Sequence, residues 1–96
     1  MTGRDADALA RDIIAARGFA EAFGHSLGHG LGLEVHEAPR LSTTSDKPLP
    51  AHAVVTVEPG IYLPGWGGVR LEDDLYLGPD GPVCLSDNRT ELIELM

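Results

Sequence analysis

The sequence predicts an α+β fold in which one amphipathic helix packs on an antiparallel sheet. Apolar residues recur at helical spacing through residues 2–17, and β-branched residues are frequent in residues 53–57. A strong turn signal at residues 78–81 lies between two segments that are expected to pair as a hairpin. With 96 residues, 43% of them hydrophobic and 23% charged, the chain is expected to form one domain or part of one.

The helix predicted at residues 2–17 has signals at both of its ends. Thr2 is placed to cap the first turn, and Asp5 occupies the position of the acidic residue in a capping box. Asp5 and Asp7 also suit the positive end of the helix dipole. Gly18 is expected to end the helix in a left-handed conformation. The buried stripe is predicted to consist of Ala6, Leu9, Ala10, Ile13 and either Ala16 or Arg17.

The rest of the chain is predicted to form short strands and loops. Residues 33–37 alternate between apolar and polar side chains, as a half-buried strand does. The serine, threonine and proline content of residues 42–52 predicts a loop. The further strands are predicted at residues 53–57, 69–77 and 83–85, and residues 91–95 form a terminal element that is either strand or helix.

The strand predicted at residues 69–77 has two different faces. Its apolar face is expected to pack on the core, and its polar face presents Arg70 and Glu72 side by side. If this polar face is exposed to solvent, it is an ordinary polar surface. If it faces a cavity, Glu72 is a candidate ligand with the Arg70 cation beside it. The apolar face consists of Val69, Leu71, Leu75 and Leu77, interrupted by Asp73, and the polar face of Arg70, Glu72, Asp74 and Tyr76.

Composition excludes several classes of function. The net charge of −8 argues against nucleic acid as a partner, because the phosphate backbone favours basic surfaces. We expect no membrane association, since no apolar run is long enough to span a bilayer and the N-terminus lacks a signal-peptide pattern. The single cysteine, Cys84, cannot form an internal disulfide, so a cytoplasmic location is expected.

Histidines and glutamates form a candidate metal site. His25, His29 and His36 lie close together among glycines, and histidine is a common metal ligand and acid–base group. Glu58 ends a predicted strand, where a half-buried carboxylate needs a cap, a salt bridge or a metal ion as partner. One histidine with Glu58 and Glu72 suggests a site for two divalent ions that acidify a bound water. Such ligation favours Mn, Co, Fe or Zn.

Three sequence blocks resemble those of Xaa-Pro aminopeptidases and prolidases. They are FGHSLGHGLGLEVHEAP at residues 23–39, VEPGIY at 57–62 and GVRLEDD at 68–74, in the order found in that family. The resemblance implies a portion of the pita-bread fold and removal of an N-terminal residue that precedes proline. It also implies two divalent ions, with Mn the first choice and Co, Zn or Fe as others, and a homodimer for the intact enzyme.

The resemblance also implies roles for six residues of this chain. His29, Glu58 and Glu72 would be metal ligands, with Glu72 bridging the ions and Glu58 also transferring protons. His25 and His36 would bind a peptide that has proline in its second position and stabilise the transition state. Arg70 would orient the site.

Two aspartate ligands that the family supplies from an upstream hairpin have no counterpart here. We therefore expect residues 1–96 to be the C-terminal part of a catalytic domain, without the upstream half and the N-terminal domain. Such a chain is expected to bind at most one divalent ion weakly and to have little or no peptidase activity. Two alternatives stay open: a metal-free creatinase-like hydrolase, and a non-catalytic binding module of the same fold.

Overall fold

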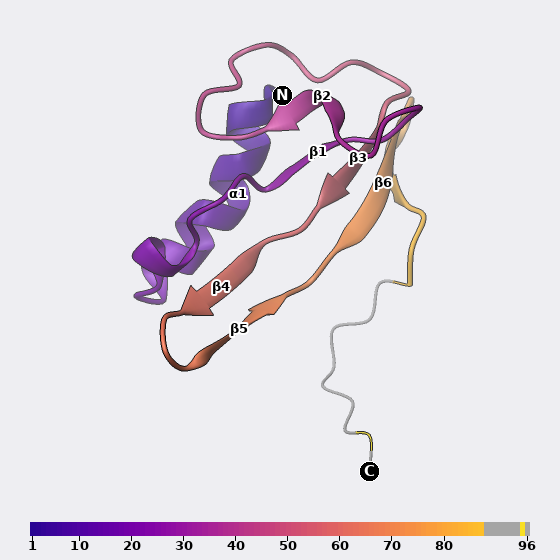
Figure 1. The fold of residues 1–96 in the computed structure, drawn as a ribbon. Helices are drawn as coiled ribbons and strands as arrows, with labels where there is room; N and C mark the ends of the chain where they lie inside the picture. Colours follow the sequence, from indigo (N-terminus) through magenta and orange to yellow (C-terminus); the bar gives the residue numbers. More distant parts are fainter. Residues whose placement is uncertain (88–94, 96) are drawn as a thin grey trace.

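The computed structural model describes residues 1–87 and 95, and within them one helix and a short 3-10 helix precede seven strands. Figure 1 shows α1 behind the sheet and a long two-stranded arm that extends from it. The helices are α1 (Gly3–Ala16) and η1 (Ala20–Ala22), and the strands are β1 (Gly28–Gly30), β2 (Glu37–Leu41), β3 (Val54–Val57), β4 (Gly60–Leu63), β5 (Gly67–Arg70), β6 (Asp73–Gly78) and β7 (Gly81–Cys84).

The strands form an antiparallel sheet and a separate antiparallel ribbon. The sheet has the order β2-β1-β3-β6-β7, and the ribbon pairs β4 with β5. The ribbon continues the line of β3 and β6, so the chain runs out along one side of the arm and back along the other (Figure 1). The predicted combination of one helix with an antiparallel sheet is confirmed.

The predicted signals at the two ends of α1 are confirmed. The Thr2 hydroxyl accepts a hydrogen bond from the Asp5 amide at 3.1 Å, and the Asp5 carboxylate accepts one from the Thr2 amide at 3.0 Å. The hydrogen bond from the Thr2 backbone, followed by that with its side chain, lowers the pKa of Asp5. Gly18 adopts a φ of +87°, which lets the chain leave the helix without strain.

The core lies between α1 and one face of the sheet. Its fully buried apolar residues come from the helix, the segment before β1, and the strands β2 and β3. They are Ala6, Phe23, Leu27, Leu41 and Val55, with Ala10, Ile14, Leu49, Ala53, Val57, Leu75 and Leu77 packed against them.

The predicted buried stripe of α1 is correct for Ala6 and Ala10 but wrong for Leu9 and Ile13. Leu9 is 60% exposed and Ile13 is 66% exposed, while Ile14 packs on the core instead. Ala16 and Arg17 are exposed as well. The reason is that α1 contacts β2 and leaves an apolar groove of about 430 Å³ beside it, which Leu9 and Ile13 line together with Leu75 and Leu77.

The strand predicted at residues 33–37 is wrong. Residues 32–36 form a series of bends with Leu33 and Val35 exposed, and the strand is Glu37–Leu41 instead. The Glu37 carboxylate accepts a hydrogen bond from the Glu34 amide at 3.1 Å. This side chain therefore closes a turn in the segment where alternation predicted extended backbone.

The strand predicted at residues 69–77 is interrupted at residues 71–72, between β5 and β6. Its apolar face is correct for Leu75 and Leu77, whereas Val69 and Leu71 are 67% and 55% exposed. The predicted hairpin is confirmed, because Gly78 pairs with Gly81 across a two-residue turn. Residues 53–57 contain β3 and residues 42–52 lack a strand, as predicted. The element predicted at residues 91–95 lies outside the described residues, apart from residue 95.

No helix within the described ranges is long and apolar enough to cross a membrane.

Replacing Thr2 by Ala should lower the free energy of unfolding by about 1 kcal/mol, because the helix then loses the acceptor for one of its first amides. Urea denaturation followed by circular dichroism measures the change. Thr43→Ala is the matched control, since Thr43 is exposed in a loop. Equal stability of the two variants would contradict a role for the cap.

Candidate functional site

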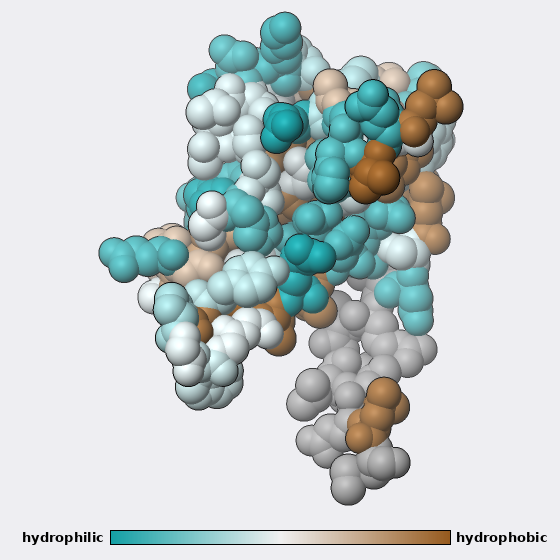
Figure 2. Space-filling model, viewed as in Figure 1, coloured by the Kyte–Doolittle hydropathy of each residue, from teal (hydrophilic) through white to brown (hydrophobic). Residues whose placement is uncertain are grey.

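A polar pocket of about 420 Å³ opens on the face of the sheet opposite α1. Figure 2 looks onto this face and shows hydrophilic side chains over its middle. Strands β1, β2, β4 and β5, together with the segments around them, bring in its lining residues. These are His25, Ser26, Gly28, His29, His36, Glu37, Arg40, Glu58, Tyr62 and Arg70.

His29 faces Glu58 inside the pocket. Its Nε2 lies 3.4 Å from Oε2 of Glu58, and the two side chains are only 16% and 14% exposed. Nδ1 of His29 lies 3.0 Å from the Gly30 carbonyl, which can only accept, so Nδ1 carries a proton. When the ring is neutral, Nε2 therefore carries a lone pair that faces the Glu58 carboxylate. A cation shared by the two groups would satisfy this arrangement.

The Glu58 carboxylate has an unsatisfied oxygen. Oε2 of Glu58 is buried and has no hydrogen-bond partner among the described residues. Leaving an ionised oxygen in this state is costly unless a positive group lies against it. The donor types fit a divalent ion, because the pair offers one imidazole nitrogen and one carboxylate oxygen from neighbouring strands.

Glu58 and Glu72 occupy opposing positions across the arm. Val57 pairs with Asp73, and three residues further along the arm Gly60 pairs with Arg70, so the register does not shift between these pairs. Side chains at opposing positions of an antiparallel pair lie on the same face, with their Cβ atoms roughly 5 Å apart. Two carboxylates placed in this way repel each other unless positive charge lies nearby.

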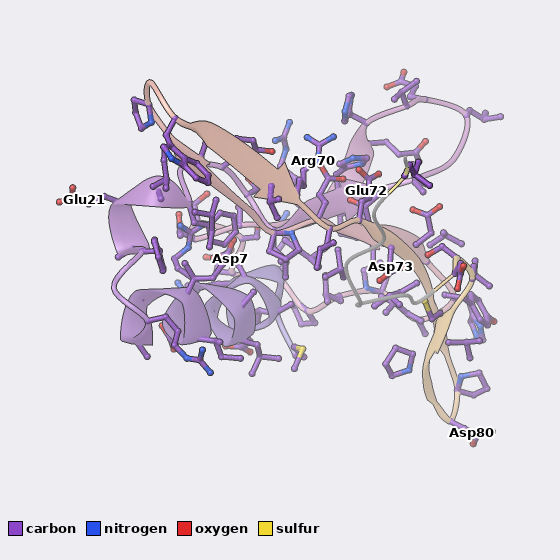
Figure 3. The ribbon with its side chains drawn as sticks, turned by 90° about the horizontal axis from the view of Figure 1, so that it is seen from below. Asp7, Glu21, Arg70, Glu72, Asp73 and Asp80 are labelled. Atoms are coloured by element: carbon purple, nitrogen blue, oxygen red, sulfur yellow. The ribbon has the colours of Figure 1, made fainter. Side chains whose placement is uncertain are left out.

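Glu72 is paired with Arg70 in this chain. Nη2 of Arg70 lies 3.6 Å from Oε1 of Glu72. The Arg70 side chain is 49% exposed and that of Glu72 is 44% exposed. Figure 3 shows the two side chains next to each other. Glu72 does not line the pocket. Among the described residues no group of three or more His, Cys, Asp or Glu side chains is close enough to hold a metal ion. The chain therefore brings two of the three predicted ligands together and leaves the third beside Arg70.

The other predicted residues also reach the pocket. Nδ1 of His25 lies 2.7 Å from the Ser26 carbonyl, and its Nε2 is buried without a hydrogen-bond partner in the described part of the chain. The His36 ring meets the His29 ring edge-on at 4.5 Å between centroids. His25, His29, His36, Glu58 and Arg70 therefore share one pocket, and their predicted roles stay predictions.

Sequence reasoning missed four polar lining residues, namely Ser26, Glu37, Arg40 and Tyr62. Tyr62 pairs with Gly68 across the ribbon, and its ring covers the positions of Gly60 and Gly68, where a Cβ would clash with it. Glycines on both strands beside an aromatic residue, one on its own strand and one opposite, were a signal in the sequence. Arg40 was missed because the strand that carries it was predicted four residues too early.

The sequence is similar to a known family of metallopeptidases. The sequence profile of metallopeptidase family M24 matches residues 1–79. The Xaa-Pro dipeptidase of Pyrococcus horikoshii is 48% identical over 93 residues, which cover 97% of this chain and 26% of that protein.

Solved structures agree with the sequence match. The structure of an Xaa-Pro dipeptidase from Bacillus anthracis superposes with a TM-score of 0.95 and 55% identity, covering 99% of this chain and 27% of that one. An X-prolyl aminopeptidase from Caenorhabditis elegans, described as a cytosolic enzyme with a di-nuclear active site, gives a TM-score of 0.67 and 37% identity over 79% of this chain and 12% of its own. The sheet and helix are therefore the corresponding portion of a pita-bread fold, and the chain spans about a quarter of the length of the curated relatives it matches.

Replacing Gly28 by Ala should destabilise the fold by about 3 kcal/mol, near the upper end of what overpacking costs. A Cβ at Gly28 would collide with the backbone carbonyl of Thr56, which β1 approaches directly beside His29. Thermal unfolding measures the effect. Gly24→Ala is the control, because a Cβ there meets no atom within 4 Å and the change should stay below about 1 kcal/mol. A Gly28→Ala variant as stable as Gly24→Ala would show that β1 does not lie this close to β3.

Proposed function

The chain belongs to metallopeptidase family M24, and from that premise we propose that it supplies three of the metal ligands of an Xaa-Pro dipeptidase or aminopeptidase. Residues 1–96 would be the C-terminal part of the catalytic domain of an enzyme that cleaves an N-terminal residue from a peptide with proline in second place. The dipeptidase relatives and the polar pocket support this substrate class. The chain covers only about a quarter of those relatives, so catalysis would need the remaining polypeptide.

The observation that carries the proposal is the buried, unsatisfied oxygen of Glu58 facing Nε2 of His29. We assign His29, Glu58 and Glu72 as the residues that would hold the ions in the intact enzyme, where Glu72 would exchange its contact with Arg70 for this role. The oxygen-rich donor set favours Mn, with Co, Zn and Fe as alternatives. When bound, the ions would supply Lewis acidity, which lowers the pKa of a water molecule so that it can lose a proton and attack at neutral pH.

The residues of this chain would bind and orient the substrate around that centre. Nε2 of His25 and the His36 ring reach the pocket and can donate to the substrate carbonyl oxygen when protonated. Glu58 would use its second oxygen to take a proton from the attacking water and pass it to the leaving amine. Arg70 would orient the site, as a cation that lines the pocket. A cytoplasmic location and a homodimer are our proposals for the intact enzyme.

Titration of the purified chain with Mn²⁺ should show at most one weakly bound ion. Paramagnetic broadening in NMR spectra should begin at the His29 and Glu58 signals, because their donors are the ones already together. His29→Ala should abolish the effect by removing the nitrogen ligand. His52→Ala is the control, since His52 is exposed and lies outside the pocket. Broadening that survives His29→Ala would contradict the assignment.

The chain alone should not cleave Xaa-Pro dipeptides with Mn²⁺ present, because two ligands are expected from elsewhere. Mass spectrometry of a proline-containing dipeptide after incubation measures this. Cleavage that a chelator stops and His29→Ala abolishes would contradict the need for further polypeptide but support the chemistry. Metal-independent binding of the dipeptide, unaffected by His29→Ala, would favour a non-catalytic binding module.

A further inference from the structure

The segment that carries His25 has little secondary structure to hold it. Residues 23–27 lie between η1 and β1 and belong to neither a helix nor a strand. Nε2 of His25 is nevertheless buried at the pocket. A side chain that must act on substrate needs placement within about 0.5 Å, and a loop without ladder bonds does not provide this alone.

A buried ion pair on α1 binds this segment. Asp7 is 1% exposed, and its carboxylate receives Nε of Arg11 at 2.7 Å and Nη2 at 3.1 Å. Figure 3 shows Asp7 between the helix and the strands. The same carboxylate accepts a hydrogen bond from the Leu27 amide at 3.0 Å, an amide that it shares with the Leu41 carbonyl. One end of the segment is therefore fixed to the helix.

The Arg11 guanidinium binds the other end. Its Nη1 donates to the Phe23 carbonyl at 2.9 Å, and its Nη2 donates to the His25 carbonyl at 2.9 Å. It also lies over the Phe23 ring, 4.2 Å from the centroid, and that ring meets the His25 ring edge-on at 5.0 Å. The pKa of Arg11 is raised by its hydrogen bond to Asp7, so the fork stays charged.

We propose that Asp7 and Arg11 are positioning residues that set the His25 imidazole in the pocket. They hold three backbone groups of the segment, at Phe23, His25 and Leu27, directly from helix α1. The planar fork of arginine is needed, because Arg11 makes four hydrogen bonds from three separate nitrogens, whereas lysine has three donors on a single nitrogen. The importance of Asp7 and Arg11 for catalysis rests on the proposed function of His25. Their effect on where the His25 ring lies does not depend on it.

The test follows the His25 ring in the 96-residue chain without metal or substrate. In NMR spectra the wild type should show a cross-peak between the rings of His25 and Tyr62, whose centroids are 5.7 Å apart. Arg11→Lys should remove that cross-peak while keeping the one between His29 and His36. A loss of stability alone would weaken both, so the pair of cross-peaks separates positioning from folding.

Matched variants and a wild-type measurement complete the test. Arg17→Lys and Asp12→Asn change exposed residues near the end of the same helix and should leave both cross-peaks intact, whereas Asp7→Asn should act like Arg11→Lys. If the Asp7 or Arg11 variants do not fold, the proposal is tested on the wild type. Its Arg11 guanidinium protons should exchange slowly with solvent, because they are hydrogen-bonded to Asp7, Phe23 and His25. Fast exchange of those protons, or a His25–Tyr62 cross-peak that survives in a folded Arg11→Lys variant, would overturn the proposal. Because neither metal nor substrate is present, failure of the metallopeptidase proposal would not alter these results.

Discussion

The site depends on two carboxylates held at opposing positions where the pairing of the sheet opens between β3–β6 and the ribbon. The register is unbroken across this opening, so Glu58 and Glu72 share one face. Like charges at such positions repel. In this chain each carboxylate turns to a different nitrogen, Glu58 to His29 and Glu72 to Arg70. In the metal site proposed above, a divalent ion between them would replace both contacts with a stronger one.

The two faces of the sheet divide structure from chemistry. On β3, Val55 and Val57 point to the core, while Thr56 lies between them on the alternate face and its hydroxyl accepts from the His29 amide at 3.1 Å. The fully buried Thr56 therefore fixes the position of the strand that carries His29 relative to β3. Because side chains alternate with period two, the apolar packing that stabilises the sheet also fixes which residues reach the pocket.

The cap of α1 and the hairpin turn were predicted correctly from the sequence, whereas the burial of α1 and the position of one strand were not. The Thr2 capping box and the turn at residues 78–81 depend on neighbouring residues only, and both are present. Periodicity identified the apolar positions of α1 but could not tell whether Leu9 would be covered, since coverage depends on what packs beside the helix. The strand at Glu37–Leu41 was displaced because a glutamate side chain closes the preceding turn. Five of the six candidate site residues share one pocket, but the opposing register of Glu58 and Glu72 required the strand pairing.

Each candidate site residue lies at or beside an interruption of regular structure, so contacts outside the strand pairing help to fix its position. His25 has the Arg11 fork, and His29 has the Thr56 hydroxyl. Glu58 follows β3 directly, and its amide donates to the Leu27 carbonyl at 2.7 Å, which joins it to the segment that Asp7 holds. Glu72 differs, because the side-chain contact it has is an exposed pair with Arg70. An exposed pair contributes little to stability, so Glu72 is free to exchange that partner for an ion at small cost. Of the candidate ligands, Glu72 is therefore the one whose position a metal ion would most readily change.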